Sequence, residues 1–324
     1  MTSLDLTDAA RRPFTGRRVR FGDVSLQVVA GSAAAAVTVL VGLIVWKVIE
    51  GARLSISHYG LAFVTRIAWN PVLGHEIYGA GSFLFGTAIT SLFALLLAAP
   101  LAMGVALFLS ELSPGWLRAP VTALVETLAA VPSVVIGLWG ILVLGPALRG
   151  HIESWLHSAF GFIPFFGDPS PAGASIFTAI IVLTIMILPI VSSISRELFL
   201  GVPHDLKEGA LALGTTRWEM VKGVVFPYSR GGIAAALILG LGRALGEAIA
   251  VTQVIGNFIP LHLSILEPGD TLASRMANQF QGATTNLQIA SLIYLGFVLL
   301  VITFVSNFAA QRIVKRFEAQ RRGA

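Results

Sequence analysis

The segment VPHDLKEGALALGTTRWEMVKGVVFP, residues 202–227, is a charged stretch placed between long apolar runs. Asp205 is expected to cap a first short helix, because Glu208 follows three residues later as in a capping box. Thr216 is expected to cap a second helix in the same way, with Glu219 as its partner. The segment therefore predicts two short helices exposed to water.

Gly214 lies between the two expected helices, where a helix often ends in the left-handed conformation that glycine favours. Pro227 is expected to end the second helix. The first helix is predicted to be about eight residues and roughly 12 Å long. Its apolar face would carry Leu206, Ala210 and Leu213.

Composition indicates an all-α, polytopic membrane protein. Hydrophobic residues make up 55% of the 324, charged residues only 12%, and six apolar runs are long enough to cross a bilayer. Pro100, Pro132 and Pro189 lie inside three of them, so kinks are expected. The first run lacks a signal-peptide cleavage site and is expected to remain as an anchor. The predicted transmembrane helices are residues 26–49, 82–109, 121–148, 174–194, 231–255 and 287–310.

Most of the 22 lysines and arginines fall on the cytoplasmic side if both termini are placed there. This bias predicts the topology of a multi-pass membrane protein, with both termini and residues 202–227 in the cytoplasm. The net charge of +5 is attributed to this asymmetry and to contact with lipid headgroups, and gives no case for nucleic-acid binding. The chain has no cysteine, and its six histidines have no ligand-like spacing, so no metal site is expected.

The fifth run contains LGLGRALGEAIAV, residues 239–251, with Arg243 and Glu247 one helical turn apart. A charge at the bilayer centre costs on the order of 2.5–3.5 kcal/mol, so both side chains should face a bundle interior or a wet pathway. Their spacing predicts that the two side chains form an ion pair with each other on a substrate pathway. The alternative is an ion pair with a purely structural role, or one made with other helices. The glycines here do not form a dinucleotide motif, and the chain has no phosphate-binding loop, so we predict no enzymatic activity.

Residues 202–227 resemble the EAA loop of ABC-importer permeases. Glu208, Gly209, Ala210 and Gly214 stand at the spacing of that motif, followed by an aliphatic residue and Pro227. Gly209 departs from the alanine of the motif. The resemblance implies that the first helix is a coupling helix, which docks on a separate ATPase subunit.

Further short sequence motifs resemble those of PstC-type permeases, which belong to phosphate ABC importers. They are WNP at 69–71, GTAITS at 86–91, ETLAAVPSVVIGLWG at 126–140 and GRALGEAIAV at 242–251. The likeness covers residues 24–316 as one transmembrane permease domain, between a basic leader, 1–23, and a tail, 317–324. It implies the type I ABC-importer permease fold and a place in the bacterial inner membrane.

The same resemblance implies the partners and the site. The partners would be a homologous PstA-type permease, two copies of a PstB-type ATPase that carries ATP and Mg, and an external PstS-type phosphate-binding protein. This chain would bind no cofactor itself and would form half of the pathway. Arg243 and Glu247 correspond to residues linked in the family to phosphate passage. Glu126 is interpreted as a gate or a structural residue.

Two other functions remain open from the sequence. One is an ABC permease for another oxyanion, such as sulfate or molybdate. The other is a stand-alone channel or ion-coupled transporter gated by Arg243 and Glu247. The charged segment 202–227 argues against the second, because a lone channel has no need of a docking helix.

Overall fold

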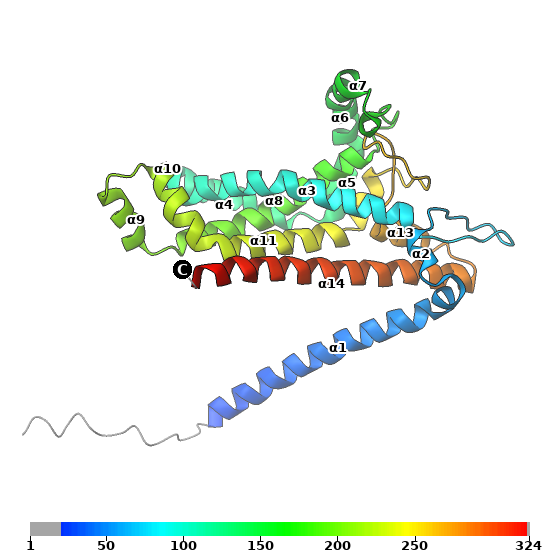
Figure 1. The fold of residues 1–324 in the computed structure, drawn as a ribbon, viewed down its shortest axis with the longest axis horizontal. Coiled ribbons are helices and arrows are strands. Elements are labelled where there is room, and N and C mark those ends of the chain that lie inside the picture. Colours follow the sequence, from blue (N-terminus) through cyan, green and yellow to red (C-terminus); the bar gives the residue numbers. More distant parts are fainter. Residues whose placement is uncertain (1–20, 323–324) are drawn as a thin grey trace, which may run out of the picture. The chain divides into compact units, whose positions relative to one another are not determined.

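The computed structural model describes residues 21–322, and these are almost entirely helical (Figure 1). Residues 1–20 of the predicted leader and 323–324 of the predicted tail lie outside the described residues. The α-helices are α1 (Phe21–Tyr59), α2 (Ala62–Thr65), α3 (Gly81–Leu107), α4 (Gly115–Ala130), α5 (Ser133–Trp139), α6 (Gly145–Leu148), α7 (Ser154–Phe160), α8 (Ile176–Leu200), α9 (His204–Ala212), α10 (Arg217–Met220), α11 (Phe226–Gly246), α12 (Ile249–Val254), α13 (Leu272–Gln279) and α14 (Asn286–Arg322). The π-helical turns are η1 (Phe108–Leu112), η2 (Gly140–Leu144), η3 (Arg149–Glu153) and η5 (Val221–Val225), and η4 (Pro164–Phe166) is a 3₁₀ turn.

The chain divides into two units, residues 1–50 and 51–324. The described part of the first unit is the beginning of α1, and almost all of its side chains are exposed, including Val28, Leu40 and Trp46. An apolar helix that is exposed on all sides is suited to contact with lipid.

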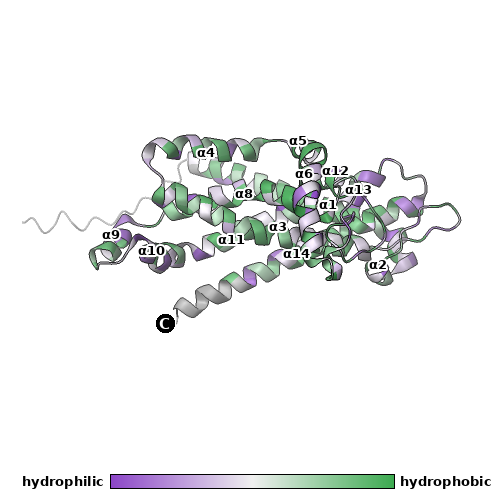
Figure 2. Ribbon diagram, turned by 90° about the horizontal axis from the view of Figure 1, so that it is seen from above, coloured by the Kyte–Doolittle hydropathy of each residue, from purple (hydrophilic) through white to green (hydrophobic). Residues whose placement is uncertain are grey.

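Six helical stretches of the described chain are long and apolar enough to cross a membrane. The predicted all-α, six-helix membrane fold is therefore confirmed. Figure 2 shows that apolar residues dominate the long helices, whereas hydrophilic residues gather in the loops and in α9 and α10. The six stretches are Val24–Tyr59, Gly81–Leu112, Ser133–Phe160, Ile176–Leu200, Arg217–Gly246 and Asn286–Arg312.

The third stretch corrects the predicted helix 121–148. α4 ends at Ala130, and both Val131 and Pro132 adopt extended backbone conformations before α5 begins. Proline lacks a backbone N–H and disfavours helical geometry in the residue before it, so Pro132 breaks the helix instead of kinking it. Pro100 and Pro189 remain inside α3 and α8. The stretch that is long and apolar enough to cross a membrane is consequently Ser133–Phe160, which comprises α5, η2, α6, η3 and α7.

The fifth stretch begins and ends earlier than the predicted helix 231–255. Helical structure runs without interruption from Arg217 through Pro227 to Gly246, so the expectation that Pro227 ends a helix is wrong. The π-helical turn η5 directly precedes Phe226 and Pro227. A widened turn changes the backbone hydrogen-bonding pattern where proline removes a donor, which explains how the helix continues.

The main core lies between α3, α8 and α11. Ala94, Ala98 and Ala102 of α3 are fully buried in a cluster with the large apolar side chains of α8, such as Leu183 and Ile187. Small residues on one helix let the backbone of its neighbour approach closely, which is how membrane helices gain packing contacts. α8 is thereby fixed against both α3 and α11.

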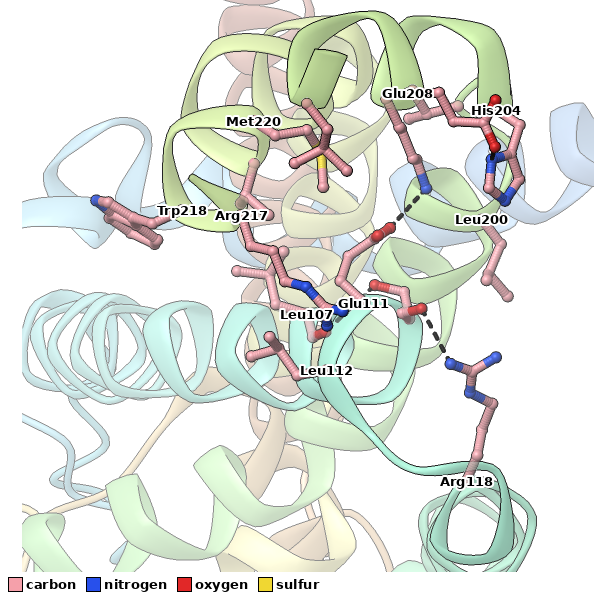
Figure 3. A pocket seen from close by; sticks show the side chains of 15 residues that line it. Leu107, Glu111, Leu112, Arg118, Leu200, His204, Glu208, Arg217, Trp218 and Met220 are labelled. Carbon is pink, nitrogen blue, oxygen red and sulfur yellow. Dashed lines mark hydrogen bonds and ion pairs between the residues drawn. The ribbon is translucent and has the colours of Figure 1, made fainter. Parts of the chain in front are cut away.

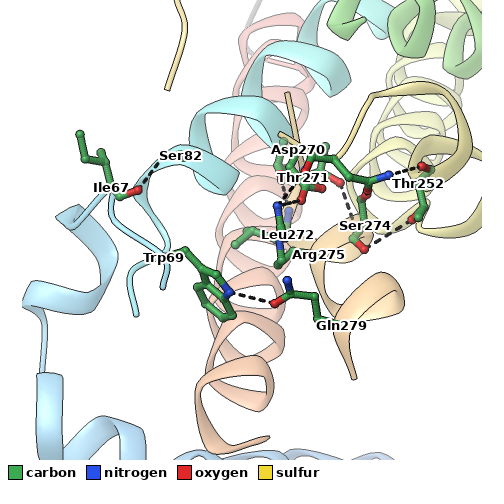
Figure 4. Close-up of polar contacts among 12 residues, drawn as sticks. Ile67, Trp69, Ser82, Thr252, Asp270, Thr271, Leu272, Ser274, Arg275 and Gln279 are labelled. Carbon is green, nitrogen blue, oxygen red and sulfur yellow. Dashed lines mark hydrogen bonds and ion pairs between the residues drawn. The ribbon is translucent and has the colours of Figure 1, made fainter. Parts of the chain in front are cut away.

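At the end of the bundle opposite α9, a buried ion pair fixes the loop that follows α12 (Figure 4). Arg275 Nη2 lies 2.5 Å from Asp270 Oδ2, and both side chains are almost fully buried. Burial raises the pKa of Asp270 to about 6, although the neighbouring Arg275 guanidinium acts in the opposite direction. The Leu272 N–H donates to Thr87 Oγ1 at 2.9 Å, so this loop is attached to α3 as well.

Gly86 in α3 faces this loop, and a Cβ atom added there would overlap the carbonyl oxygen of Asp270. Gly86→Ala is therefore expected to lower the free energy of unfolding by about 1–3 kcal/mol, because the backbone of the loop must move. The measurement is the thermal unfolding midpoint of the purified protein in detergent.

Gly104→Ala is the matched control, since Gly104 also lies in α3 and has no atom within 4 Å of an added Cβ. Alanine should leave stability unchanged there or raise it by about 0.5–1 kcal/mol. Equal unfolding midpoints for the two variants would contradict the packing described for Gly86.

Candidate functional site

The first part of the candidate site is α9, which lies beside α10 at one end of the helical bundle (Figures 1 and 2). α9 begins after Pro203, which occupies the N-cap position without a side-chain hydrogen bond. The prediction that Asp205 caps this helix is therefore wrong. Asp205 lies in the first turn instead, where a carboxylate is stabilised by the helix dipole.

The turn after α9 agrees with the sequence-based prediction. Gly214 has a φ angle of +85°, in the left-handed region that favours glycine. Thr216 and Glu219 form the predicted capping box: the Thr216 N–H donates to Glu219 Oε2 at 2.8 Å, and the Glu219 N–H donates to Thr216 Oγ1 at 3.3 Å. Both expected features are confirmed, and they fix the direction in which α10 leaves.

One face of α9 is open. The Glu208 side chain is 71% exposed and contacts His204 Nδ1 at 3.3 Å, while a Cβ added to Gly209 would meet no atom within 4 Å. Leu206 and Leu213, two of the three residues predicted to form the apolar face of this helix, are also exposed. Ala210 packs instead against the buried cluster that includes Val221 and Val225. The exposed part of α9 thus carries both acidic and apolar side chains.

The second part is Arg243, near the end of α11. The predicted pairing with Glu247 along one continuous helix is wrong, because α11 ends at Gly246 and Glu247 adopts an extended conformation. The two side chains still approach, with Arg243 Nη2 3.9 Å from Glu247 Oε2. Glu247 Oε1 also accepts a hydrogen bond from the Ala250 N–H at 3.3 Å, at the beginning of α12. Glu247 therefore has a structural contact of its own.

The ion pair leaves the guanidinium available for other contacts. Its side chain is 40% exposed, whereas that of Glu247 is 9% exposed, and 3.9 Å is a long separation for an ion pair. In the described residues this is the one ionic contact of Arg243. A hydrogen bond between two charged groups would be shorter and stronger than this contact, so Glu247 restrains Arg243 only weakly.

Arg243 lies in an open groove of about 580 Å³ between three helices. Ile190 comes from α8, Leu239 and Arg243 from α11, and Asn307 and Gln311 from α14. The amide oxygen of Asn307, Oδ1, is buried without a hydrogen-bond partner, and it is an acceptor. A guanidinium and two amides in an otherwise apolar groove can donate hydrogen bonds to an oxyanion. Neither amide was expected from the sequence, although amides in an apolar run are a detectable signal.

Glu126 lies elsewhere. It is exposed on α4 and lines a small crevice together with Thr122, Ser192 and Arg196. It does not line the Arg243 groove. The structure therefore brings Arg243 and Glu247 together, keeps the α9 residues in one segment, and leaves Glu126 apart from both.

Comparison with known proteins agrees with this architecture. Residues 98–319 match the family described as binding-protein-dependent transport system inner membrane component. A chain of the bacterial alginate ABC transporter, in complex with its alginate pentasaccharide-bound periplasmic protein, aligns with a TM-score of 0.60 over 91% of this chain and 98% of that chain, at 19% identity. The MetNI methionine ABC transporter aligns with a TM-score of 0.53 over 72% of this chain and 94% of that chain, at 17% identity. The predicted ABC-importer permease fold is confirmed.

Curated relatives extend over nearly the whole chain. The phosphate transport system permease protein PstC of Xylella fastidiosa is 41% identical over 87% of this chain and 88% of its own length. PstC of Mesorhizobium japonicum is 41% identical over 95% of both chains. PstC 2 of Mycobacterium tuberculosis is 39% identical over 97% of this chain and 98% of its own. The chain therefore belongs to the binding-protein-dependent transport system inner membrane component family and, within it, to the PstC permeases.

Proposed function

We propose that this chain is the PstC-type permease subunit of an ATP-driven phosphate importer and forms half of the translocation pathway. The observation that carries the proposal is the half-exposed Arg243 guanidinium in an apolar groove between three helices. A cation placed there at high desolvation cost needs a functional reason, and passage of an anion supplies one. The names of the curated relatives point to phosphate as that anion.

Phosphate would be held by the planar guanidinium of Arg243, whose donors match two oxygens of an oxyanion. Asn307 and Gln311 would add amide donors from α14. Glu247 would compete with the anion for Arg243 and prevent phosphate from being trapped. Transport requires binding that is weak enough for release, and the long 3.9 Å contact suits such an exchange.

ATP hydrolysis would be carried by a partner subunit, because the chain has no phosphate-binding loop in its sequence. The exposed face of α9, with Glu208 and Gly209, would dock on that ATPase as the coupling helix. The assembly would hold this chain, a homologous PstA-type permease and two PstB-type ATPase subunits with ATP and Mg. An external PstS-type protein would deliver phosphate.

The orientation would place both termini and α9 in the cytoplasm. This proposal is supported by the place of α9 and α10 at one end of the helical bundle (Figure 1), and by the lysines and arginines of residues 196–230 and 312–322, which number ten of the 22 in the chain. The loops at the other end, including the loop fixed by Asp270 and Arg275, would receive the binding protein.

A permease for sulfate or molybdate is the nearest alternative, since a guanidinium also binds those oxyanions. Uptake of labelled phosphate in the presence of excess sulfate or molybdate separates the two. The stand-alone channel is disfavoured because α9 offers a large exposed docking face that a channel would not use.

Arg243→Gln is expected to reduce phosphate uptake by at least about tenfold, which corresponds to the loss of roughly 1.4 kcal/mol of interaction at the cation. Glu247→Gln should be milder, because the cation remains. Arg243→Lys keeps the charge without the planar fork, so partial activity would favour simple attraction over bidentate contact. The measurement is labelled phosphate uptake normalised to the amount of protein in the membrane.

Arg149→Gln is the control for the loss of an arginine, since Arg149 is exposed in η3 and does not line the groove. It should transport as the parent does. Parental uptake by Arg243→Gln would remove Arg243 from the pathway and return its pair with Glu247 to a structural role.

Glu208→Ala and Gly214→Asp are expected to leave the protein in the membrane but to uncouple it. Glu208 contacts the exposed side chain of His204, and a residue other than glycine in the left-handed conformation of Gly214 costs about 1–2 kcal/mol, which does not unfold a packed six-helix bundle. The measurement is ATP hydrolysis by the assembled complex after addition of phosphate-loaded binding protein, beside uptake.

Gly209→Ala is the matched control, because it changes the same helix, meets no atom within 4 Å and restores the alanine of the motif. It should remain coupled. If complexes with Glu208→Ala or Gly214→Asp transport phosphate as the parent does, and hydrolyse ATP in response to the binding protein as the parent does, α9 is not the coupling helix.

A further inference from the structure

Lys207 lies on the bundle-facing side of α9 and is largely buried, whereas the neighbouring Glu208 side chain is exposed. Its Nζ atom lies 2.6 Å from Glu111 Oε1, in the π-helical turn η1 at the end of α3. The same ammonium donates to the carbonyl oxygen of Phe199, in the last turn of α8, at 2.9 Å. Both side chains of the ion pair are only 12% exposed. One ammonium therefore connects α9 to two membrane helices.

The surroundings make this connection important for the position of α9. The main neighbours of α9 are α10 and η5, and its boundary with the end of α3 contains a cavity of about 630 Å³ (Figure 3). Leu107 and Leu112 line the cavity from the α3 side, and Leu211 and Trp218 line it from the side of α9 and α10. Because apolar packing is incomplete there, the ion pair provides a direct link across the gap.

The Glu111 end of the link is itself held in place. Arg118 of α4 donates from Nη2 to the carbonyl oxygen of Ser110 at 3.3 Å and from Nε to Ser113 Oγ at 3.3 Å. These bonds flank Glu111 on both sides and fix the turn that carries it. Helical segments with a π-turn are frequently found at functional positions, since the turn redirects a side chain.

Stability alone does not explain the pair. A partly buried ion pair contributes little net stability compared with apolar side chains of similar size, because both charges lose water. Such pairs do fix geometry, since removing either partner leaves a charge without compensation. A pair that joins a docking helix to two transmembrane helices is well placed for that purpose.

We propose that Lys207 and Glu111 are positioning residues that pass the movement of α9 to α3 and α8 during transport. α8 packs against α11, which carries Arg243, so the link connects the docking helix with the helix of the proposed anion site. This inference rests on the proposed function, because it requires that α9 contacts an ATPase.

The experiment uses the full permease and ATPase complex with its binding protein, in proteoliposomes. Lys207→Met and Glu111→Gln remove one charge each, and Lys207→Glu with Glu111→Lys exchanges them. The measured quantity is phosphate transported per ATP hydrolysed. Each single variant is expected to lower this ratio at least about fivefold, the lower end of usual coupling energies. The exchanged pair should recover more of the ratio than either single variant, though incompletely, because the contact with Phe199 is lost.

Lys222→Met is the matched control, since Lys222 is an exposed lysine of the neighbouring turn η5. It should keep the parental ratio. The proposal is overturned if the single variants keep the parental ratio, or if the exchanged pair has a ratio no higher than that of either single variant. It is also overturned if Lys207→Met disappears from the membrane, because the pair would then be needed for folding. Absence of ATP-driven phosphate uptake in the parent complex would instead refute the proposed function.

Discussion

Hydrocarbon offers no hydrogen-bond partner to a polypeptide backbone, and this constraint underlies the architecture of the chain. It accounts for the nearly complete helicity of the described residues and for six stretches long enough to cross a bilayer. Backbone that leaves the helix at membrane depth must find partners inside the protein. Glu247, extended between α11 and α12, shows how this is done, because its carboxylate accepts the Ala250 N–H at the start of the next helix.

The same constraint determines where charges occur. α9 carries its charges at the end of the bundle, where Glu208 can face water. Asp270 and Arg275 are buried only as a close ion pair that ties the loop after α12 to the bundle. Arg243 differs from this pair, since its contact with Glu247 is long and its side chain remains 40% exposed. A charge that is costly and incompletely compensated is a better candidate for function than one fully paired.

Local features of the fold could be predicted from the sequence. The Gly214 turn and the Thr216 capping box depend on residues a few positions apart, and the six spans depend on apolar length. The prolines could not be distinguished in this way, because Pro132 breaks a helix whereas Pro100 and Pro189 remain inside one. Whether a freed carbonyl finds another partner depends on neighbouring helices, which a local pattern does not contain.

Long-range contacts were equally inaccessible to sequence patterns. Lys207 and Glu111 are 96 positions apart, and the convergence of Asn307 with Arg243 in one groove depends on how α11 and α14 pack. The expected ion pair of Arg243 with Glu247 does form, but the two residues do not lie on one continuous helix. The spacing was compatible with one helix, whereas the chain uses the end of α11 and the beginning of α12.

The central claim is that the chain conducts phosphate only as part of an ATP-driven assembly. The most direct measurement is uptake of labelled phosphate by proteoliposomes that contain this chain, the partner permease and the ATPase, with the binding protein outside and ATP supplied to the ATPase. The account predicts accumulation that requires ATP and every subunit and that excess sulfate does not inhibit. Phosphate flux through this chain without the ATPase, or equal inhibition by sulfate, would contradict it.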